Sequence, residues 1–291
     1  MPFKLGDWIQ HATFGPGQIT ADPETHYVIR FVKVGEKRLH KTFVTEAGEP
    51  PSPDFKFPEL GKAKKLSSTA SRTKSRAVAF SFDHLLERLL GVYPAGFEDP
   101  SFENDERSYK QAAVSKFHEA LNEQALHQLI EGGNFEEISN RAKHMASAKM
   151  NLIFPQELMS LNDALKTPEG QQAFSLSLFD VRYGKDEKSA RFERYVATLD
   201  KIGSLKWTIA TYFQFLATSG ADMFMKPMVS QALADAVGVD LKYATVPNWQ
   251  TCRLLEDLRK VFNGSLNWLG LHPKSRIDVQ SFMYVAWQSS K

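Results

Sequence analysis

The sequence contains almost no cysteine and no long apolar run. A single cysteine, Cys252, among 291 residues excludes an internal disulfide and favours a reducing compartment, so we expect a cytoplasmic protein. No stretch approaches the roughly 20 consecutive apolar residues that a membrane span requires, and the chain starts without an apolar signal core. The sequence therefore predicts a globular protein without a membrane partner.

The motifs of nucleotide and metal chemistry are also missing. The chain has no Gly-rich phosphate loop, no Rossmann glycine fingerprint, no HExxH and no CxxC, and its eight histidines lack the spacing of metal ligands. The Gly-x-Ser-x-Gly motif of serine hydrolases is absent as well. These absences argue against nucleotide hydrolysis and zinc chemistry, and we expect neither a cofactor nor a metal.

The net charge of +2 hides an uneven distribution along the chain. Residues 1–79 carry 13 Lys and Arg against 8 Asp and Glu, residues 80–200 carry 13 against 20, and residues 201–291 carry 10 against 6. Two basic ends and an acidic middle suit contact with a polyanion through the ends. A solvated surface explains the modest excess nearly as well.

Residues 1–48 have the composition of a small β-barrel. The segment 27–32 has strand composition, and turns are expected near Gly15-Pro16-Gly17 and Gly35-Glu36-Lys37. The pattern from His11 to Ile19, followed by Ile29-Arg30-Phe31, resembles the Tudor or SH3-like module of bacterial repair helicases. This resemblance implies a docking module for protein or nucleic acid, with glycines in the first tight turn and Phe14 as a core anchor.

Residues 49–79 are rich in Pro, Ser and Lys and are predicted to be a flexible linker. Its second half carries six basic side chains and no acidic one, so it suits contact with DNA phosphates, although a soluble tether is an equal alternative. The six basic residues are Lys62, Lys64, Lys65, Arg72, Lys74 and Arg76.

Every strong periodic signal after Phe80 is helical, so residues 80–291 are predicted to form one all-α domain of roughly eight to ten helices. The expected helices cover 82–89, 109–130, 136–149, 155–166, 171–181, 192–199, 207–216, 228–237, 254–262 and 279–286. The fold class is therefore α+β and multidomain, with a small N-terminal β-barrel (Tudor/SH3-like) before a large all-α domain.

The segment 199–238 is predicted to be a helix, a turn and a second helix, with Asp222 and Lys226 in the turn. Pro227 suits a first helical position and Gly238 suits a helix stop. With Gly203 and Lys206 before the first helix, the order resembles the core of the helix-hairpin-helix DNA glycosylases, in which a Gly-rich hairpin precedes a helix that opens with Lys or Arg. The second turn of that hairpin is missing, and Lys226 stands where the family has its catalytic Asp.

Polar residues also precede two later helices, at 247–251 and 275–281. These helix N-termini and that of the helix after Lys226 are expected to converge on one cleft. Helix N-termini favour an anion, either a carboxylate of the chain or a DNA phosphate. In the glycosylase reading Asp222 or Asp278 is the carboxylate, and Lys226 and Lys206 are nucleophile or phosphate contacts. Trp249, Asn248, Tyr243 and Gln280 then line the base pocket.

Each of these residues also has an ordinary structural explanation. Asp278 and Asn248 are good N-caps, and Trp249 suits core packing. Lys226 suits either burial, which lowers an amine pKa, or an ion pair with Asp222. Cys252 lies on the apolar stripe of a predicted helix and is expected in the core.

The leading hypothesis is a DNA glycosylase that excises a modified base everted from double-stranded DNA. A glycosylase without the hairpin is similar to the prokaryotic antiphage DNA glycosylases, which implies hypermodified phage bases such as glucosylated hydroxymethylcytosine as substrate and antiphage defence as role. Repair of alkylated or oxidised bases stays open. The alternatives are a non-catalytic adaptor, whose barrel docks a protein partner and whose site has no cleft, and an enzyme acting on RNA or a free nucleoside.

Overall fold

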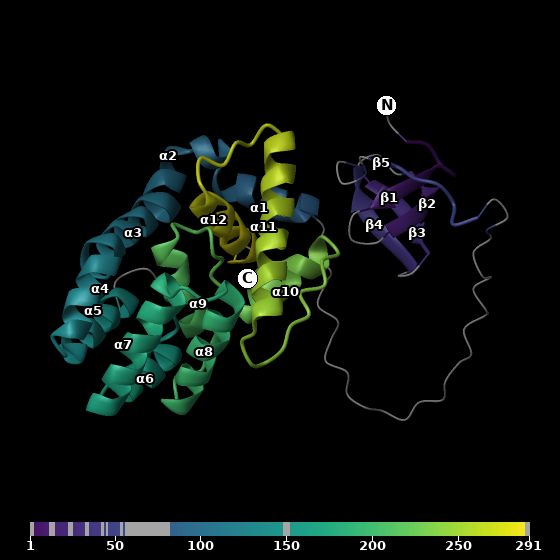
Figure 1. The fold of residues 1–291 in the computed structure, drawn as a ribbon. Helices are drawn as coiled ribbons and strands as arrows, with labels where there is room; N and C mark the ends of the chain where they lie inside the picture. Colours follow the sequence, from purple (N-terminus) through teal and green to yellow (C-terminus); the bar gives the residue numbers. More distant parts are fainter. Residues whose placement is uncertain are drawn as a thin grey trace, which may run out of the picture. The chain divides into compact units, whose positions relative to one another are not determined.

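A computed structural model describes residues 3–11, 15–22, 26–32, 35–41, 44, 46–52, 55, 82–147 and 152–288. The chain divides into two compact units, one made of Met1–Asp83 with Asp235–Val239 and the other of His84–Ala234 with Asp240–Lys291. A small antiparallel sheet belongs to the first unit, and the second is mostly helical (Figure 1).

The sheet has five strands in the order β4-β3-β2-β1-β5, and all neighbours run antiparallel. The strands are β1 (Trp8–His11), β2 (Gly15–Ala21), β3 (His26–Phe31), β4 (Gly35–His40) and β5 (Glu46–Ala47). Alternate residues of β3, namely Tyr27, Ile29 and Phe31, are buried together with Ile9 and Ile19. This period of two is the pattern expected of a sheet with one covered face.

The residues near which turns were predicted, 15–17 and 35–37, lie at the starts of β2 and β4. Gly15 opens β2, pairs with His11 and has a positive φ of 73°. Gly17 lies inside β2, where an added Cβ would meet the Phe31 side chain at 2.5 Å, so this glycine serves packing across the sheet. Gly35 is the first residue of β4 and pairs with Phe31 of β3. Phe14 and the basic linker residues 62–76 lie outside the described residues.

The helical region follows the predicted order. The longer helices are α1 (Phe82–Val92), α3 (Ser108–Ala120), α4 (Glu123–Glu131), α5 (Phe135–Ser147), α6 (Pro155–Ala164), α7 (Pro168–Tyr183), α8 (Lys188–Lys201), α9 (Trp207–Ala217), α10 (Pro227–Ala236), α11 (Trp249–Trp268) and α12 (Arg276–Gln288). Short turns of helix, η2 (Gly96–Glu98), α2 (Pro100–Phe102) and the π-helical η3 (Glu103–Arg107), join α1 to α3.

The one long helix expected over 109–130 is two helices. Leu121 leaves the helical conformation with φ −131°, and the side chain of Asn122 accepts a hydrogen bond from the N–H of Ala125 at 2.9 Å. An Asn that caps a new helix competes with continuation of the old one, which is why the apolar periodicity alone did not show the break.

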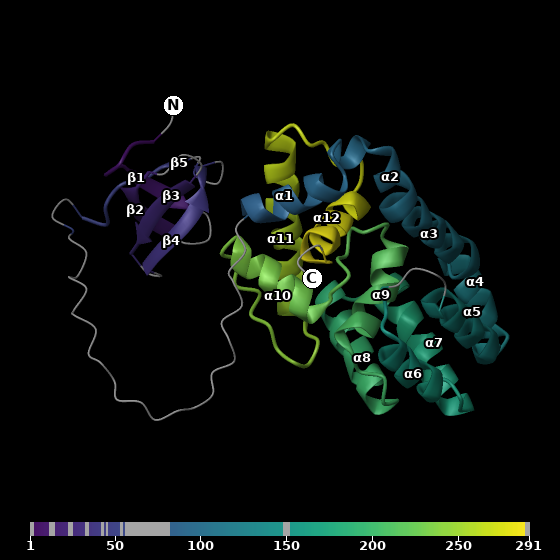
Figure 2. The same ribbon diagram turned by 180° about the vertical axis from the view of Figure 1, so that it is seen from behind.

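Helix α9 lies in the middle of its unit, in contact with α3, α6 and α8 (Figure 2). All eleven of its residues are buried. A helix that is apolar on every side is typical of a core position, and its one long polar side chain, Gln214, is therefore carried into the interior. In the described part of the chain, no helix has both the length and the apolar composition that crossing a bilayer requires.

Candidate functional site

The segment from Asp222 to Lys226, between α9 and α10, borders two different pockets. Asp222 and Met223 line the first, and Phe224 and Lys226 line the second. The two charged residues of the predicted cluster therefore have different surroundings. We name the two cavities the Asp222 pocket and the Lys226 pocket.

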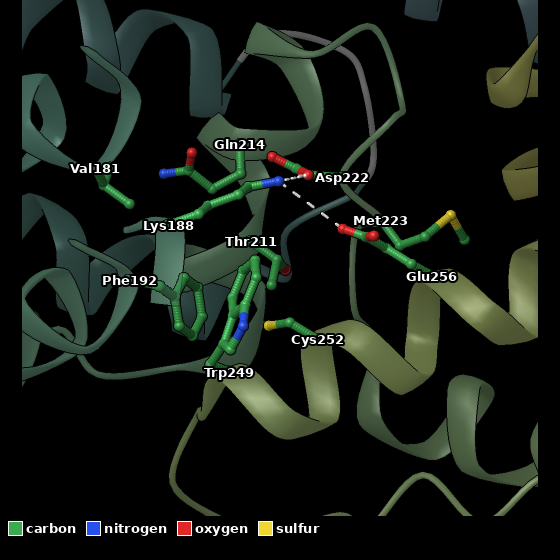
Figure 3. A pocket seen from close by; sticks show the side chains of 10 residues that line it. All are labelled: Val181, Lys188, Phe192, Thr211, Gln214, Asp222, Met223, Trp249, Cys252 and Glu256. Atoms are coloured by element: carbon green, nitrogen blue, oxygen red, sulfur yellow. Dashed lines mark hydrogen bonds and ion pairs between the residues drawn. The ribbon is translucent and has the colours of Figure 1, made fainter. Parts of the chain in front are cut away.

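The Asp222 pocket is formed where α7, α8, α9 and α11 meet the segment after α9. Its cavity volume is about 20 Å³, which is room for about one water molecule. Figure 3 shows Lys188 extending toward Asp222 and Glu256, with the ring of Trp249 beside that of Phe192. Its lining residues are Val181, Lys188, Phe192, Thr211, Gln214, Asp222, Met223, Trp249, Cys252 and Glu256.

Two carboxyl groups share one lysine in this pocket. The ammonium of Lys188 forms a short ion pair with Asp222 and lies 3.9 Å from Oε1 of Glu256. The guanidinium of Arg182 lies 3.6 Å from the other oxygen of Asp222. The backbone N–H of Asp222 donates to Oγ1 of Thr218 at 2.8 Å, which fixes the carboxylate at the pocket wall.

The two carboxyl groups of the Asp222 pocket have different charged neighbours. Burial raises the pKa of Glu256, the Lys188 ammonium opposes this shift, and the Asp222 carboxylate adds to it. Asp222 itself has two cations beside it, Lys188 and Arg182. A carboxyl group held toward its protonated form next to one held by cations is the arrangement that separates a general acid from a stabilising carboxylate.

One wall of the Asp222 pocket is aromatic. The rings of Trp249 and Phe192 have centroids 5.9 Å apart, and the Lys188 ammonium lies 5.4 Å from the Trp249 ring centre. Trp249 is the first residue of α11, where Asn248 caps the helix by accepting from the N–H of Thr251 at 2.9 Å. The predicted cap and the predicted pocket aromatic thus occupy adjacent positions with different roles.

Two buried polar atoms of this pocket form no hydrogen bond within the described part of the chain. They are Oδ2 of Asp222, an acceptor, and Nε2 of Gln214, a donor. Such atoms are few in folded proteins, because each costs about 1–3 kcal/mol when left unsatisfied. A single water molecule in this cavity offers both the donor and the acceptor that the two atoms require, and Arg182 also lies 3.6 Å from Oδ2 of Asp222.

Cys252 lies in the same pocket rather than fully in the core. It is partly buried on α11, and burial raises the pKa of its thiol well above the ordinary value. A thiol held in this protonated form is a poor nucleophile, so we assign it to the pocket wall.

The Lys226 pocket is formed by α3, α10 and α12 and has a cavity volume of about 10 Å³, room for at most one water molecule. The Lys226 ammonium lies 4.9 Å from the ring centre of Phe154 and 4.3 Å from that of Tyr284. Burial and the neighbouring Lys110 lower the pKa of Lys226 to about 8, although Glu157 opposes the shift. Gln280 borders this pocket too, so Lys226 and Gln280 are brought together while Asp222 is not part of the group.

Asp278 has the contacts of a structural carboxylate. Its side chain is fully buried. Its two oxygens accept hydrogen bonds from Nε and one Nη of Arg107, each at 2.9 Å. It also accepts the N–H groups of Lys274 and Ser275 and the hydroxyl of Ser275, while the Ser275 hydroxyl accepts the Asp278 N–H. This reciprocal pair is a capping box at the start of α12, and it leaves the carboxylate engaged on both oxygens.

The remaining predicted residues lie outside both pockets. Tyr243 is 37% exposed in the segment between α10 and α11, with its ring 6.2 Å from that of Trp207. Lys206 is exposed at the N-cap of α9. Gly203 has φ 74°, and the N–H groups of Gly203 and Ser204 donate to Asp200 and Leu199. These bonds form a Schellman motif that ends α8, so the hairpin-like glycine is a helix C-cap.

Sequence reasoning missed Glu256, Lys188 and Gln214. A signal for Glu256 was present, because positions 249, 252 and 256 are three and seven residues apart and share one face of a helix. Gln214 had the weaker signal of one polar residue in an otherwise apolar helix. Nothing in the sequence linked Lys188 to Asp222, which are 34 residues apart.

Among the described residues, no group of three His, Cys, Asp or Glu side chains is placed to hold a metal ion. No family model matches the chain, and comparisons with curated proteins and with solved structures found no match.

Proposed function

We propose that the protein is a DNA glycosylase and that the Asp222 pocket is its active site. The observation that carries this proposal is the carboxyl pair of Asp222 and Glu256, which shares Lys188 and faces the aromatic ring of Trp249. Cleavage of an N-glycosidic bond requires a proton for the departing base and a negative charge near the sugar cation. This pair supplies both.

Glu256 is the general acid in this proposal. Burial raises its pKa, which favours the protonated form, and that proton moves to the departing base as the bond from C1′ to the base nitrogen breaks. Asp222, paired with Lys188 and Arg182, stabilises the positive sugar and orients the water that adds to C1′. The proton that this water loses passes to the Glu256 carboxylate, which restores the acid.

Recognition of the base falls to Trp249 and Gln214. The Trp249 ring offers a stacking surface for an everted base, which has lost its stacking neighbours in the duplex. The unsatisfied Nε2 of Gln214 donates to an acceptor on the base edge, and Oδ2 of Asp222 accepts from the nucleophilic water. The cavity holds about one water molecule, so this proposal requires the pocket to open before a base enters, and the Trp249 side chain at its wall is the group proposed to move.

The substrate we propose is a hypermodified base of phage DNA, such as glucosylated hydroxymethylcytosine, with antiphage defence as the role. This choice rests only on the resemblance of a glycosylase without the hairpin to the prokaryotic antiphage DNA glycosylases. The exposed Lys206 and the basic linker residues 62–76 contact DNA phosphates in this proposal. The N-terminal sheet is proposed to be a Tudor-like barrel that docks a protein or nucleic-acid partner.

If the protein is an adaptor, no cleft is expected beside Asp222, Lys226 and Asp278. The cavities beside Asp222 and Lys226 have volumes of about 20 and 10 Å³, room for about one water molecule each, so the adaptor alternative stays open. Only Asp278 has the fully engaged surroundings that the adaptor reading required.

The proposal is tested by counting abasic sites. Duplex DNA with glucosylated hydroxymethylcytosine and matched unmodified DNA are incubated with the protein, and abasic sites are labelled through their aldehyde. Abasic sites in the modified DNA alone are expected, and Glu256→Gln should remove them. Modified DNA that stays intact in the presence of folded, DNA-binding protein would refute the proposal.

A further inference from the structure

Two arginines beside the Asp222 pocket, Arg259 and Arg276, form no ion pair with a carboxylate in the described part of the chain. Arg259 lies three residues after Glu256 on α11, and Arg276 is the first residue of α12. Nε of Arg259 is buried and has no hydrogen-bond partner among the described residues. We name these two residues the arginine pair.

The lysines that lie near these arginines in the sequence are paired. Nζ of Lys260 lies 2.8 Å from a carboxylate oxygen of Asp257, and Nζ of Lys274 lies 2.7 Å from one of Glu98. These two carboxylates therefore serve the lysines and not the arginine pair.

The charges of the arginine pair act on each other. Helices α11 and α12 lie side by side (Figures 1 and 2). Burial lowers the pKa of the Arg259 guanidinium, Arg276 lowers it too, and Glu256 opposes the shift. Because a guanidinium keeps its proton in proteins, the fold holds two like charges near each other at a cost in free energy.

The segment before Asp222 connects the arginine pair to the Asp222 pocket. Gly220 has φ 83°, and a Cβ added to it would lie 3.4 Å from Cβ of Arg276. Asp222 follows two residues later. On the other side, Glu256 lines the pocket about one helical turn before Arg259. The arginine pair therefore lies beside both carboxyl groups of the pocket.

Positive charge exceeds negative charge in this region. The Asp222 carboxylate already has Lys188 and Arg182 beside it. Burial raises the pKa of Glu256, which disfavours its negative charge. The charges of the arginine pair are then left without compensation. A water molecule satisfies a donor N–H but does not neutralise a charge, so the region favours an anion.

Phosphate is the anion whose geometry fits an arginine pair. The planar fork of a guanidinium binds a phosphate through two parallel hydrogen bonds. The cavity of the Asp222 pocket holds about one water molecule, so the anion must bind at the surface beside it. Residues 201–291 carry 10 Lys and Arg against 6 Asp and Glu, which is the sign of charge that a nucleic-acid backbone attracts.

We propose that the arginine pair binds one phosphate group of the DNA backbone beside the Asp222 pocket. This inference rests on the proposed function, in which DNA is the ligand, and it assigns a contact separate from those of the linker. A phosphate held there positions the adjoining nucleotide next to the carboxyl groups of the pocket. Inorganic phosphate has the same chemistry, so the test includes it.

The test measures binding of unmodified duplex DNA by fluorescence anisotropy at several salt concentrations, so it does not require base release. The double variant Arg259→Gln with Arg276→Gln should bind about tenfold more weakly, as loss of charged hydrogen bonds predicts. The slope of log K against log salt should become shallower by about 0.9, the value for one phosphate. Arg276→Lys keeps the charge but not the fork, so it should keep the slope.

Arg194→Gln is the matched control. This arginine of α8 lies 2.8 Å from Asp180 and 3.0 Å from Asp186, so its charge is already balanced. Its replacement should leave both the affinity and the salt slope unchanged. Circular dichroism shows that each variant is folded.

Inorganic phosphate is titrated into the unaltered protein and the double variant by calorimetry at constant ionic strength. Phosphate binding that the double variant loses, combined with an unchanged slope for DNA, would assign the pair to a free phosphate ion and overturn the proposal. An unchanged slope in the folded double variant, an equal loss in Arg194→Gln, or no DNA binding by the unaltered protein would overturn it as well.

The result is distinguishable from a failure of the proposed function. Base release together with an unchanged salt slope would remove the phosphate site alone. The expected change in slope without base release from modified DNA would remove the glycosylase activity and leave the phosphate site in place.

Discussion

Replacing Asp278 by Asn tests which carboxylate belongs to the fold and which to the site. The substitution keeps the shape of the side chain but removes its charge. The Arg107 guanidinium, whose side chain is only 4% exposed, then loses a partner that binds it through two hydrogen bonds at 2.9 Å. Glu103 still forms an ion pair with Arg107 at the surface, so part of the guanidinium charge remains neutralised.

The expected loss follows from these contacts. Removing one member of a buried ion pair costs about 3–5 kcal/mol, and the surviving Glu103 contact places this case near the lower end. The Asp278 side chain also caps α12, and a lost cap costs about 1 kcal/mol. We therefore expect about 3–4 kcal/mol of destabilisation. For a unit of this size that is about 10 °C in Tm.

Thermal and urea unfolding followed by circular dichroism measure this loss. The matched control is Asp257→Asn, which breaks an ion pair with Lys260 on the exposed face of α11 and should cost under about 1 kcal/mol. An Asp278→Asn protein with wild-type stability and no base release would show that Asp278 is catalytic and that its role was misjudged from its contacts.

Four further predictions concern the Asp222 pocket and the linker. Glu256→Gln should lower base release by about 10²-fold or more without loss of stability at pH 7, since its raised pKa means that the fold penalises the ionised form. Wild-type activity and the contribution of Glu256 to stability should both fall as pH rises through that pKa; an unchanged pH profile in Glu256→Gln contradicts this. Asp222→Asn should also abolish base release, but with a smaller Tm loss than Asp278→Asn, because its Lys188 partner is 40% exposed and stays hydrated. Trp249→Ala should weaken binding to modified DNA by about 1–3 kcal/mol in equilibrium titrations, and equal loss on unmodified DNA would exclude base stacking. Neutralising the six basic linker residues should flatten the salt dependence of DNA binding by about 0.9 for each phosphate that is no longer neutralised, whereas an unchanged slope would make the linker a tether.

The order of secondary structure was largely predictable, because periodicity reports which residues are buried. The helices after Phe82 were predicted from that periodicity, whereas the strand over 27–32, which is β3 (His26–Phe31), was predicted from its composition. The errors have local causes. Asn122 caps a new helix inside an apolar pattern, and Gly17 lies inside β2, opposite Phe31 of the neighbouring strand β3.

The site was only half predictable, because side-chain direction depends on tertiary packing. Asp222 and Lys226 are four residues apart, yet they line different pockets. The predicted cap at Asn248 was confirmed by its bond to Thr251, since capping is a local property. Glu256 and Lys188 meet Asp222 only because α8 and α11 pack against the same segment, which no local pattern encodes.

The most direct test of the central claim is to identify the released base. Phage DNA carrying glucosylated hydroxymethylcytosine is incubated with an excess of the protein, and the low-molecular-weight fraction is analysed by mass spectrometry beside a Glu256→Gln reaction. The account predicts the free modified base from the unaltered protein and none from the variant. No free base from a folded protein that binds the DNA, or equal release by Glu256→Gln, would contradict it.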